Sequence, residues 1–193
     1  MLHTLKECLS SPDIKNVKIA TGYWDIPGLA LLTDDIKAFL EKEDTKLLLL
    51  IGKDPYVYAS QVKNPKYKDK NYPADFIRTD LCELEPKEEF ENAVRLLLDF
   101  CTEGGYSKIQ IRMFRKNEED ETQFLHSKCY IFDGLNAGKG YGLIGSSNFT
   151  QKGLQGNAEL NYLETDVTKV LSTTPFKDTY EIISCHQSQL CAF

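Results

Sequence analysis

The sequence predicts a mixed α/β fold, in which helices pack on the faces of a central mixed β-sheet. In the first half of the chain, strand-like apolar runs alternate with segments of helical periodicity, whereas strand-like segments cluster in the second half. With 193 residues, the chain suits one domain, 1–193, which buries roughly 70% of its unfolded surface. The alternative is that this domain is the N-terminal part of a longer protein.

The elements of the first half follow from the spacing of apolar residues. Leu29, Leu32 and Ile36 recur three and four positions apart, which indicates a helix, and the same spacing returns before Gly104 and Gly105. A continuous apolar run closed by a glycine is typical of a strand covered on both faces. The expected elements are a strand at 17–21, a helix at 28–42, a strand at 46–51, a loop at 53–73, a helix at 88–101 and a strand at 108–114.

The second half is expected to be mostly strands joined by turns. An acidic run is typical of a solvated turn, and a glycine-rich stretch between two strand-like segments is typical of a hairpin. The expected elements are a turn at 118–121, a strand at 124–132, a turn at 133–140, a strand at 141–145, a strand at 157–164 and a mostly helical tail at 166–185.

Composition excludes several classes of protein. The first fifteen residues lack the apolar stretch of a secretory signal, and the longest apolar run, 47–51, is too short to cross a bilayer. The six cysteines form no CxxC pair and the three histidines lie far apart, so zinc-ligand spacing is absent. We therefore expect a cytoplasmic protein with reduced thiols, no metal, no cofactor and no membrane contact.

Positive charge is concentrated in two stretches, although the net charge of −6 disfavours a protein that coats DNA with its whole surface. Lysines interleaved with tyrosines can follow a phosphate backbone and stack bases. A solvated loop with partly packed tyrosines explains the first stretch equally well. The residues are Lys53, Lys63, Lys66, Lys68 and Lys70 in the first stretch, and Lys108, Arg112, Arg115 and Lys116 in the second.

Three polar pairs in the second half of the chain each span two positions. Side chains at positions i and i+2 project from the same face of a strand, so three neighbouring strands would gather all six groups at one place. The pairs are His126 with Lys128, Ser146 with Asn148, and Asn157 with Glu159. This arrangement predicts an active site.

The first two pairs lie within the patterns HxK(x4)D, which ends at Asp133, and GSxN, which begins at Gly145. Together they resemble the signature of the phospholipase D superfamily, which cleaves phosphodiesters through a histidine nucleophile. The resemblance implies a phospholipase D-like fold. The segments at 20–24, 148–150 and 153–154 look like those of nuclease-type members, including restriction enzymes and modules found ahead of superfamily 2 helicases.

The chemistry of phosphodiester cleavage suggests a role for each residue of the pattern. His126 is the expected nucleophile that forms a phosphohistidine, while Lys128 and Asn148 stabilise the non-bridging phosphate oxygens. Glu159 is expected to hold the other ring nitrogen of His126. Four further residues have expected binding or supporting roles. Ser146 would hydrogen-bond near the phosphate, Asp133 would stabilise the end of its strand, Asn157 would support the site, and Gly22 would allow a turn where phosphate approaches.

In the superfamily two half-sites face each other, one histidine attacking and the other protonating the leaving group. This chain contains one half-site, because neither His3 nor His186 is followed by lysine two positions later. The resemblance therefore implies a homodimer that pairs two copies of His126, or a second half beyond Phe193. We favour the homodimer.

Two classes of function remain. The first is a metal-independent phosphodiesterase that cleaves DNA, and the second is a non-catalytic module that binds nucleic acid for a fused or partner helicase or ATPase. The glycines at 140–145 are not followed by the lysine that a P-loop requires. Asp80, Glu85 and Lys87 superficially match a metal-dependent nuclease pattern, but Pro86 is incompatible with the central strand that this pattern needs. A phospholipid substrate is a weaker choice because no amphipathic membrane-docking segment stands out.

Overall fold

The computed structural model describes residues 1–52, 84–101, 107–114, 125–134 and 139–166. Several expectations concern residues outside these ranges and stay predictions. They are the loop at 53–73, the turn at 118–121 and the helical tail, of which only Asp166 is described.

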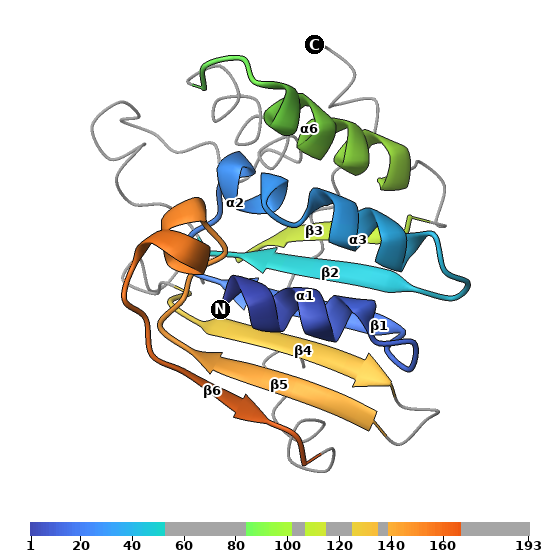
Figure 1. Ribbon diagram of the computed structural model, residues 1–193, viewed down its shortest axis with the longest axis vertical. Coiled ribbons are helices and arrows are strands. Elements are labelled where there is room, and N and C mark those ends of the chain that lie inside the picture. Colours follow the sequence, from blue (N-terminus) through green and yellow to red (C-terminus); the bar gives the residue numbers. More distant parts are fainter. Residues whose placement is uncertain (53–83, 102–106, 115–124, 135–138, 167–193) are drawn as a thin grey trace, which may run out of the picture.

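The six described strands form one sheet in the order β3-β2-β1-β4-β5-β6 (Figure 1). The strands are β1 (Asn16–Thr21), β2 (Lys46–Ile51), β3 (Ile109–Met113), β4 (Lys128–Gly134), β5 (Lys139–Gly145) and β6 (Asn161–Glu164). β1, β2 and β3 run parallel, whereas β4, β5 and β6 each run antiparallel to the preceding strand of the order. The expected mixed sheet is therefore confirmed.

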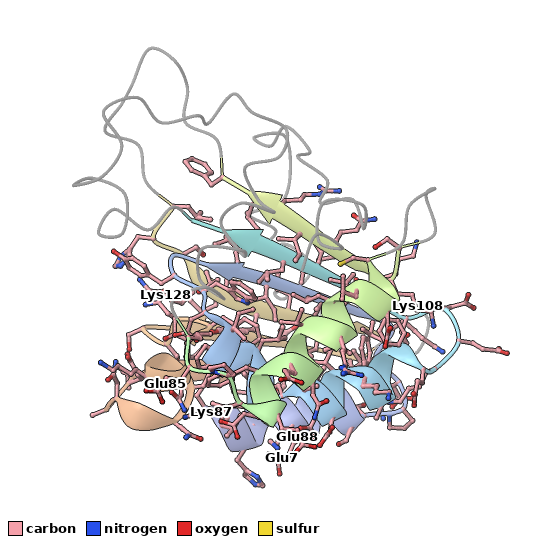
Figure 2. The ribbon with its side chains drawn as sticks, turned by 90° about the horizontal axis from the view of Figure 1, so that it is seen from above. Glu7, Glu85, Lys87, Glu88, Lys108 and Lys128 are labelled. Carbon is pink, nitrogen blue, oxygen red and sulfur yellow. The ribbon has the colours of Figure 1, made fainter. Side chains whose placement is uncertain are left out.

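The described α-helices lie on the same side of the sheet, as Figure 2 shows. They are α1 (Leu2–Ser10), α2 (Ile26–Ala30), α3 (Thr33–Leu40) and α6 (Glu88–Phe100), and a short π-helix, η2 (Lys152–Gly156), follows β5. α1 packs on α3, and α6 packs on α2 and α3. In the part of the chain that the structure describes, no helix is long and apolar enough to cross a membrane.

The main hydrophobic core lies between this helical layer and the sheet. Phe39 from α3 and Phe132 from β4 are almost fully buried there. A second cluster lies on the opposite face of the sheet and is formed by Ala20, Leu50, Cys129 and Ile131. Burial raises the pKa of the Cys129 thiol to about 11, so this cysteine is protonated at neutral pH and behaves as a packing residue.

The single helix expected at 28–42 is wrong, because two helices occupy this segment. The carboxylate of Asp25 caps α2 by accepting a hydrogen bond from the Gly28 N–H at 2.7 Å. A turn closed by the Leu32 N–H and the Leu29 carbonyl, 2.9 Å apart, then separates α2 from α3. Leu29, Leu32 and Ile36 are all buried, so the apolar spacing continues across a break that periodicity alone does not reveal.

Two strands are shorter than expected at their first residues. β4 begins at Lys128 and not at 124, and β6 begins at Asn161 and not at 157. Of the six residues of the polar pairs, Lys128 is the first residue of β4, whereas the other five lie in loops at the end of the sheet: His126, Ser146, Asn148, Asn157 and Glu159.

Candidate active site

The polar pairs gather at one end of the sheet, here called the active-site end. The C-terminal ends of β1, β2 and β3 meet the N-terminal end of β4 there, and Thr21 lies opposite Lys128 in the ladder. Figure 2 shows Lys128 at this end and Lys108 at the other. Polar groups collect readily at strand ends because loops leave side chains and backbone N–H groups available for a ligand.

His126 and Asn148 approach each other over the backbone of Gly22. A Cβ atom added at Gly22 would lie 3.3 Å from Cδ2 of His126, 3.4 Å from Oδ1 of Asn148 and 3.2 Å from the carbonyl oxygen of Leu125. Gly22 is not in the left-handed region, so its expected role in a turn is replaced by close packing: a larger residue would push the two functional side chains apart.

The His126 side chain is exposed and is not packed into the core. Its imidazole ring stands edge-to-face with the ring of Tyr23, with centroids 6.4 Å apart and an angle of 86° between the planes. This contact restricts the orientation of the imidazole while leaving it open to an incoming substrate. An accessible imidazole beside polar groups is suited to nucleophilic attack.

The carboxamide of Asn148 is oriented by the backbone of β1 and the loop that follows it. The Tyr23 N–H donates a hydrogen bond to Oδ1 of Asn148 at 3.1 Å. With the oxygen engaged in this way, the amide nitrogen is left as the donor side of the group. Asn148 lies near the imidazole of His126, and its amide nitrogen has the polarity needed to bind phosphate oxygens.

The ammonium group of Lys128 contacts the backbone of His126. Its Nζ donates to the carbonyl oxygen of His126 at 3.1 Å, and the residue is only 8% exposed. Burial lowers the pKa of Lys128, and the negative charge of Glu159 acts in the opposite direction. The structure therefore places a partly desolvated cation next to the candidate nucleophile.

Glu159 is the counter-charge of this cation. Hydrogen bonds from the side chains of Ser146 and Asn157 lower the pKa of Glu159, and the charge of Lys128 lowers it further. The Asn157 contact, from Nδ2 to Oε1 of Glu159, measures 3.1 Å. The expected bond from Glu159 to the ring of His126 stays a prediction.

Ser146 joins the two loops that carry the other polar pairs. Its hydroxyl accepts a hydrogen bond from the Leu160 N–H at 3.0 Å, and its own N–H donates to the Leu160 carbonyl at 3.0 Å. These bonds hold the segment of Glu159 beside the loop of Asn148. Ser146 therefore has a clear positioning role, and its contact with phosphate stays a prediction.

Asp133 lies away from the other members of the pattern. It is five residues beyond Lys128 along β4, roughly 17 Å at the usual rise per residue, and its side chain is 2% exposed. Its carboxylate faces Lys18 on β1, with 3.6 Å between Nζ and Oδ2. This ion pair fits the expected support of the strand end and gives Asp133 no place at the active-site end.

Of the residues in the two positive stretches, Lys108 and Arg112 lie within the described ranges, and Arg112 is close to the active-site end. It lies on β3 opposite Leu50, its Nη2 donates to Oε1 of Gln110 at 3.2 Å, and its buried Nε has no hydrogen-bond partner among the described residues. Lys108 instead caps α3 at the other end of the sheet, donating to the carbonyl of Lys42 at 2.8 Å. The remaining residues of this group lie outside the described ranges: Lys53, Lys63, Lys66, Lys68, Lys70, Arg115 and Lys116.

Two residues near the site were not singled out from the sequence. Tyr23 contacts both His126 and Asn148, and the buried hydroxyl of Thr21 bonds the backbone on both sides of this region. The sequence signals that include them are the resemblance of segment 20–24 to nuclease-type members and its position at the C-terminal end of a strand in a mixed sheet, where ligands commonly bind.

Comparison with known proteins defines the class to which this fold and site belong. A family model described as "Cardiolipin synthase, PLD-like domain" matches residues 5–173, which is most of the chain. The chain therefore belongs to the PLD-like domain family, and the expected membership of the phospholipase D superfamily is confirmed. This membership supports phosphodiester chemistry at the family level.

Solved structures of low sequence identity resemble the model. NucT from Helicobacter pylori has a TM-score of 0.46 and 16% identity over 89% of this chain and 80% of its own. Nuc from Salmonella typhimurium, a phospholipase D family member, has a TM-score of 0.48 and 13% identity over 88% and 79%. Phosphatidylserine synthase from Haemophilus influenzae Rd KW20 has a TM-score of 0.51 and 18% identity over 87% of this chain and 32% of its own. No curated protein matches.

Proposed function

We propose that this chain is a metal-independent phosphodiesterase, with DNA as its substrate, that acts through a phosphohistidine on His126. The observation that carries the proposal is that the exposed imidazole of His126 and the carboxamide of Asn148 both lie close to the backbone of Gly22. The ammonium group of Lys128 also donates a hydrogen bond to the backbone carbonyl of His126. A nucleophile, an oriented amide donor and a cation thus share one place.

In the first step a ring nitrogen of His126 attacks phosphorus. A P–N bond forms, the bond from phosphorus to the leaving oxygen breaks, and that oxygen takes a proton from an acid. In the second step water attacks phosphorus and gives a proton to the group that acted as the acid in the first step, the P–N bond breaks, and the imidazole is restored. Lys128 and the amide nitrogen of Asn148 stabilise the charge that builds on the non-bridging oxygens in both steps.

The acid of the first step is the group that a single half-site lacks. One imidazole does not serve at once as the nucleophile bound to phosphorus and as the donor to the leaving oxygen. Homodimerisation would supply His126 of a second copy as this donor. A second half-site carried by a longer form of the protein is the alternative source.

Two features of the sequence favour DNA over phospholipid as the substrate. The segments at 20–24 and 148–150 look like those of nuclease-type members, and two stretches of the sequence concentrate positive charge that suits a phosphate backbone. The second candidate function is a non-catalytic module that positions nucleic acid for a helicase or ATPase, including those of restriction systems. The exposed imidazole of His126 favours catalysis, because binding alone has no need of a nucleophile at this place.

The test is cleavage of plasmid DNA and a short duplex in excess EDTA. We expect cleavage by the wild-type protein, none by His126→Ala, and full activity of His3→Ala, whose histidine lies on α1 with its side chain 86% exposed. Cleavage that needs added Mg²⁺, or that persists in His126→Ala, would refute the mechanism. DNA binding without cleavage by the wild-type protein would favour the non-catalytic module.

A further inference from the structure

The loop that carries Asn148 is held on both sides by buried side chains. On one side, the hydroxyl of Tyr130 donates to the carbonyl of Ser147 at 2.8 Å. On the other side, the N–H of Phe149 donates to the hydroxyl oxygen of Thr21 at 2.9 Å. Asn148 therefore lies between two anchored backbone positions.

Thr21 is also tied to the residue that orients the Asn148 carboxamide. Its hydroxyl donates to the Tyr23 carbonyl at 2.7 Å, and the Tyr23 N–H in turn donates to Oδ1 of Asn148 at 3.1 Å. One hydroxyl group thus uses its donor on Tyr23 and its acceptor on Phe149. Together these contacts fix the backbone on both sides of the carboxamide.

The position of Thr21 makes this link rigid. Thr21 is fully buried at the last residue of β1, where the ladder pairs it with Lys128 on one side and Ile51 on the other. The side chain therefore has no room to adopt another rotamer, and β-branching restricts it further. No charged or exposed group of the site is involved, so the link is separate from the groups that contact substrate.

We propose that Thr21 is a positioning residue that holds the Asn148 carboxamide with its N–H donors toward the phosphate oxygens. The inference rests on the proposed phosphodiesterase function. It explains why a polar residue occupies the buried end of β1, and it assigns the orientation of Asn148 to a side chain outside the HxK(x4)D and GSxN patterns.

The kinetic test compares Thr21→Val, which keeps the shape but removes the hydroxyl, with Thr21→Ser, which keeps the hydroxyl. We expect kcat of Thr21→Val to fall about 10- to 100-fold with KM changed less than about threefold, because a displaced donor weakens transition-state binding. Thr21→Ser should recover kcat to within about threefold of the wild-type value. Equal losses in both variants would overturn the proposal.

Thr45→Val provides a matched control at the opposite end of the sheet. Thr45 is 1% exposed and its hydroxyl donates to the Lys42 carbonyl at 3.0 Å, so this variant also removes a buried threonine hydroxyl. Thr45→Val should keep the wild-type kcat. A fall of kcat in Thr45→Val as large as that in Thr21→Val would show general destabilisation and overturn the proposal.

A crystal structure of Thr21→Val separates this inference from the proposed function, because it needs no catalysis. We expect Oδ1 of Asn148 to leave the Tyr23 N–H, with their separation increased from 3.1 Å to beyond hydrogen-bond reach. An unchanged bond would contradict the inference even if the enzyme is active. A wild-type protein without phosphodiesterase activity would instead contradict the proposed function.

Discussion

At the active-site end, burial and the charge of Glu159 have opposite effects on the pKa of Lys128. Burial lowers the pKa of Lys128, while Glu159 raises it by favouring the charged ammonium. Since only the protonated form can stabilise a phosphate, the carboxylate keeps the lysine active to higher pH. Activity should therefore be lost on the alkaline side as Lys128 deprotonates.

Glu159→Gln should move this alkaline limb of kcat/KM to lower pH. The sign follows from the charge: without the carboxylate, the pKa of Lys128 falls further, and the lysine deprotonates sooner as the pH rises. The measurement is the pH profile of kcat/KM, with Glu164→Gln on β6 as the control. A limb that stays in place or moves to higher pH would contradict this coupling.

Asn148→Asp tests the orientation of the carboxamide. The new carboxylate can still accept the Tyr23 N–H, but it places a negative charge where an amide donor would face the phosphate. We expect kcat to fall about 100-fold or more, as for the loss of an oxyanion donor, with little change in melting temperature. Activity near that of the wild type would mean that Asn148 has no role in binding the phosphate.

At the scale of elements, the loops at the active-site end pack closely together because glycines at the contacts have no side chain. A Cβ atom at Gly52 would lie 2.4 Å from the Leu125 carbonyl oxygen and 2.7 Å from that of Gly22. These close approaches bring the end of β2 against the segments that flank His126. The site thus depends on two glycines, Gly22 and Gly52, that directly follow β1 and β2.

Gly52→Ala should lower both stability and activity, because backbone atoms must move to admit the methyl group. We expect destabilisation of about 1–3 kcal/mol, measured by denaturant unfolding together with kcat. Gly156→Ala on η2 is the control, since its Cβ would meet only the Lys152 side chain, at 3.8 Å. Equal stability of both variants would show that the packing around Gly52 is loose.

The helices and strands also show which structural features apolar periodicity can predict. The strand expected at 46–51 is β2 with the observed bounds, because the apolar run 47–51 is flanked by Lys46 and closed by Gly52. The break between α2 and α3 could not be predicted, since the residues on both sides of it are buried in the same core. Apolar spacing records burial, and it does not record where the backbone turns.

The active site likewise has features that the sequence predicts and features that it does not. The residues that bear the chemistry, His126, Lys128 and Asn148, could be named from their spacing. That His126 and Asn148 lie in loops, with Lys128 at the first residue of β4, could not be predicted, because an i and i+2 pair looks the same before a strand as within it. Thr21 and Tyr23 act through hydrogen bonds between segments more than a hundred residues apart. Such contacts depend on strand order, which the sequence does not display.

At the scale of the whole molecule, the proposal requires two half-sites. If a homodimer supplies them, mixing wild-type protein with an excess of His126→Ala should reduce activity by more than dilution, because mixed dimers lack one imidazole. The measurement is specific activity against mixing ratio, after subunits have exchanged, with dimers verified by analytical ultracentrifugation. Mixing with His3→Ala should cause no loss. Activity that follows simple dilution, or a monomeric active protein, would exclude the homodimer.

The most direct test of the account is the capture of the covalent intermediate on His126. Brief reaction of the wild-type protein with a phosphorus-labelled phosphodiester in EDTA, followed by rapid denaturation, should give a labelled protein that is stable in base and labile in acid, as expected for a phosphohistidine. His126→Ala should remain unlabelled. A wild-type protein that cleaves the substrate without becoming labelled, or a label that persists in His126→Ala, would contradict the claim that this imidazole attacks phosphorus.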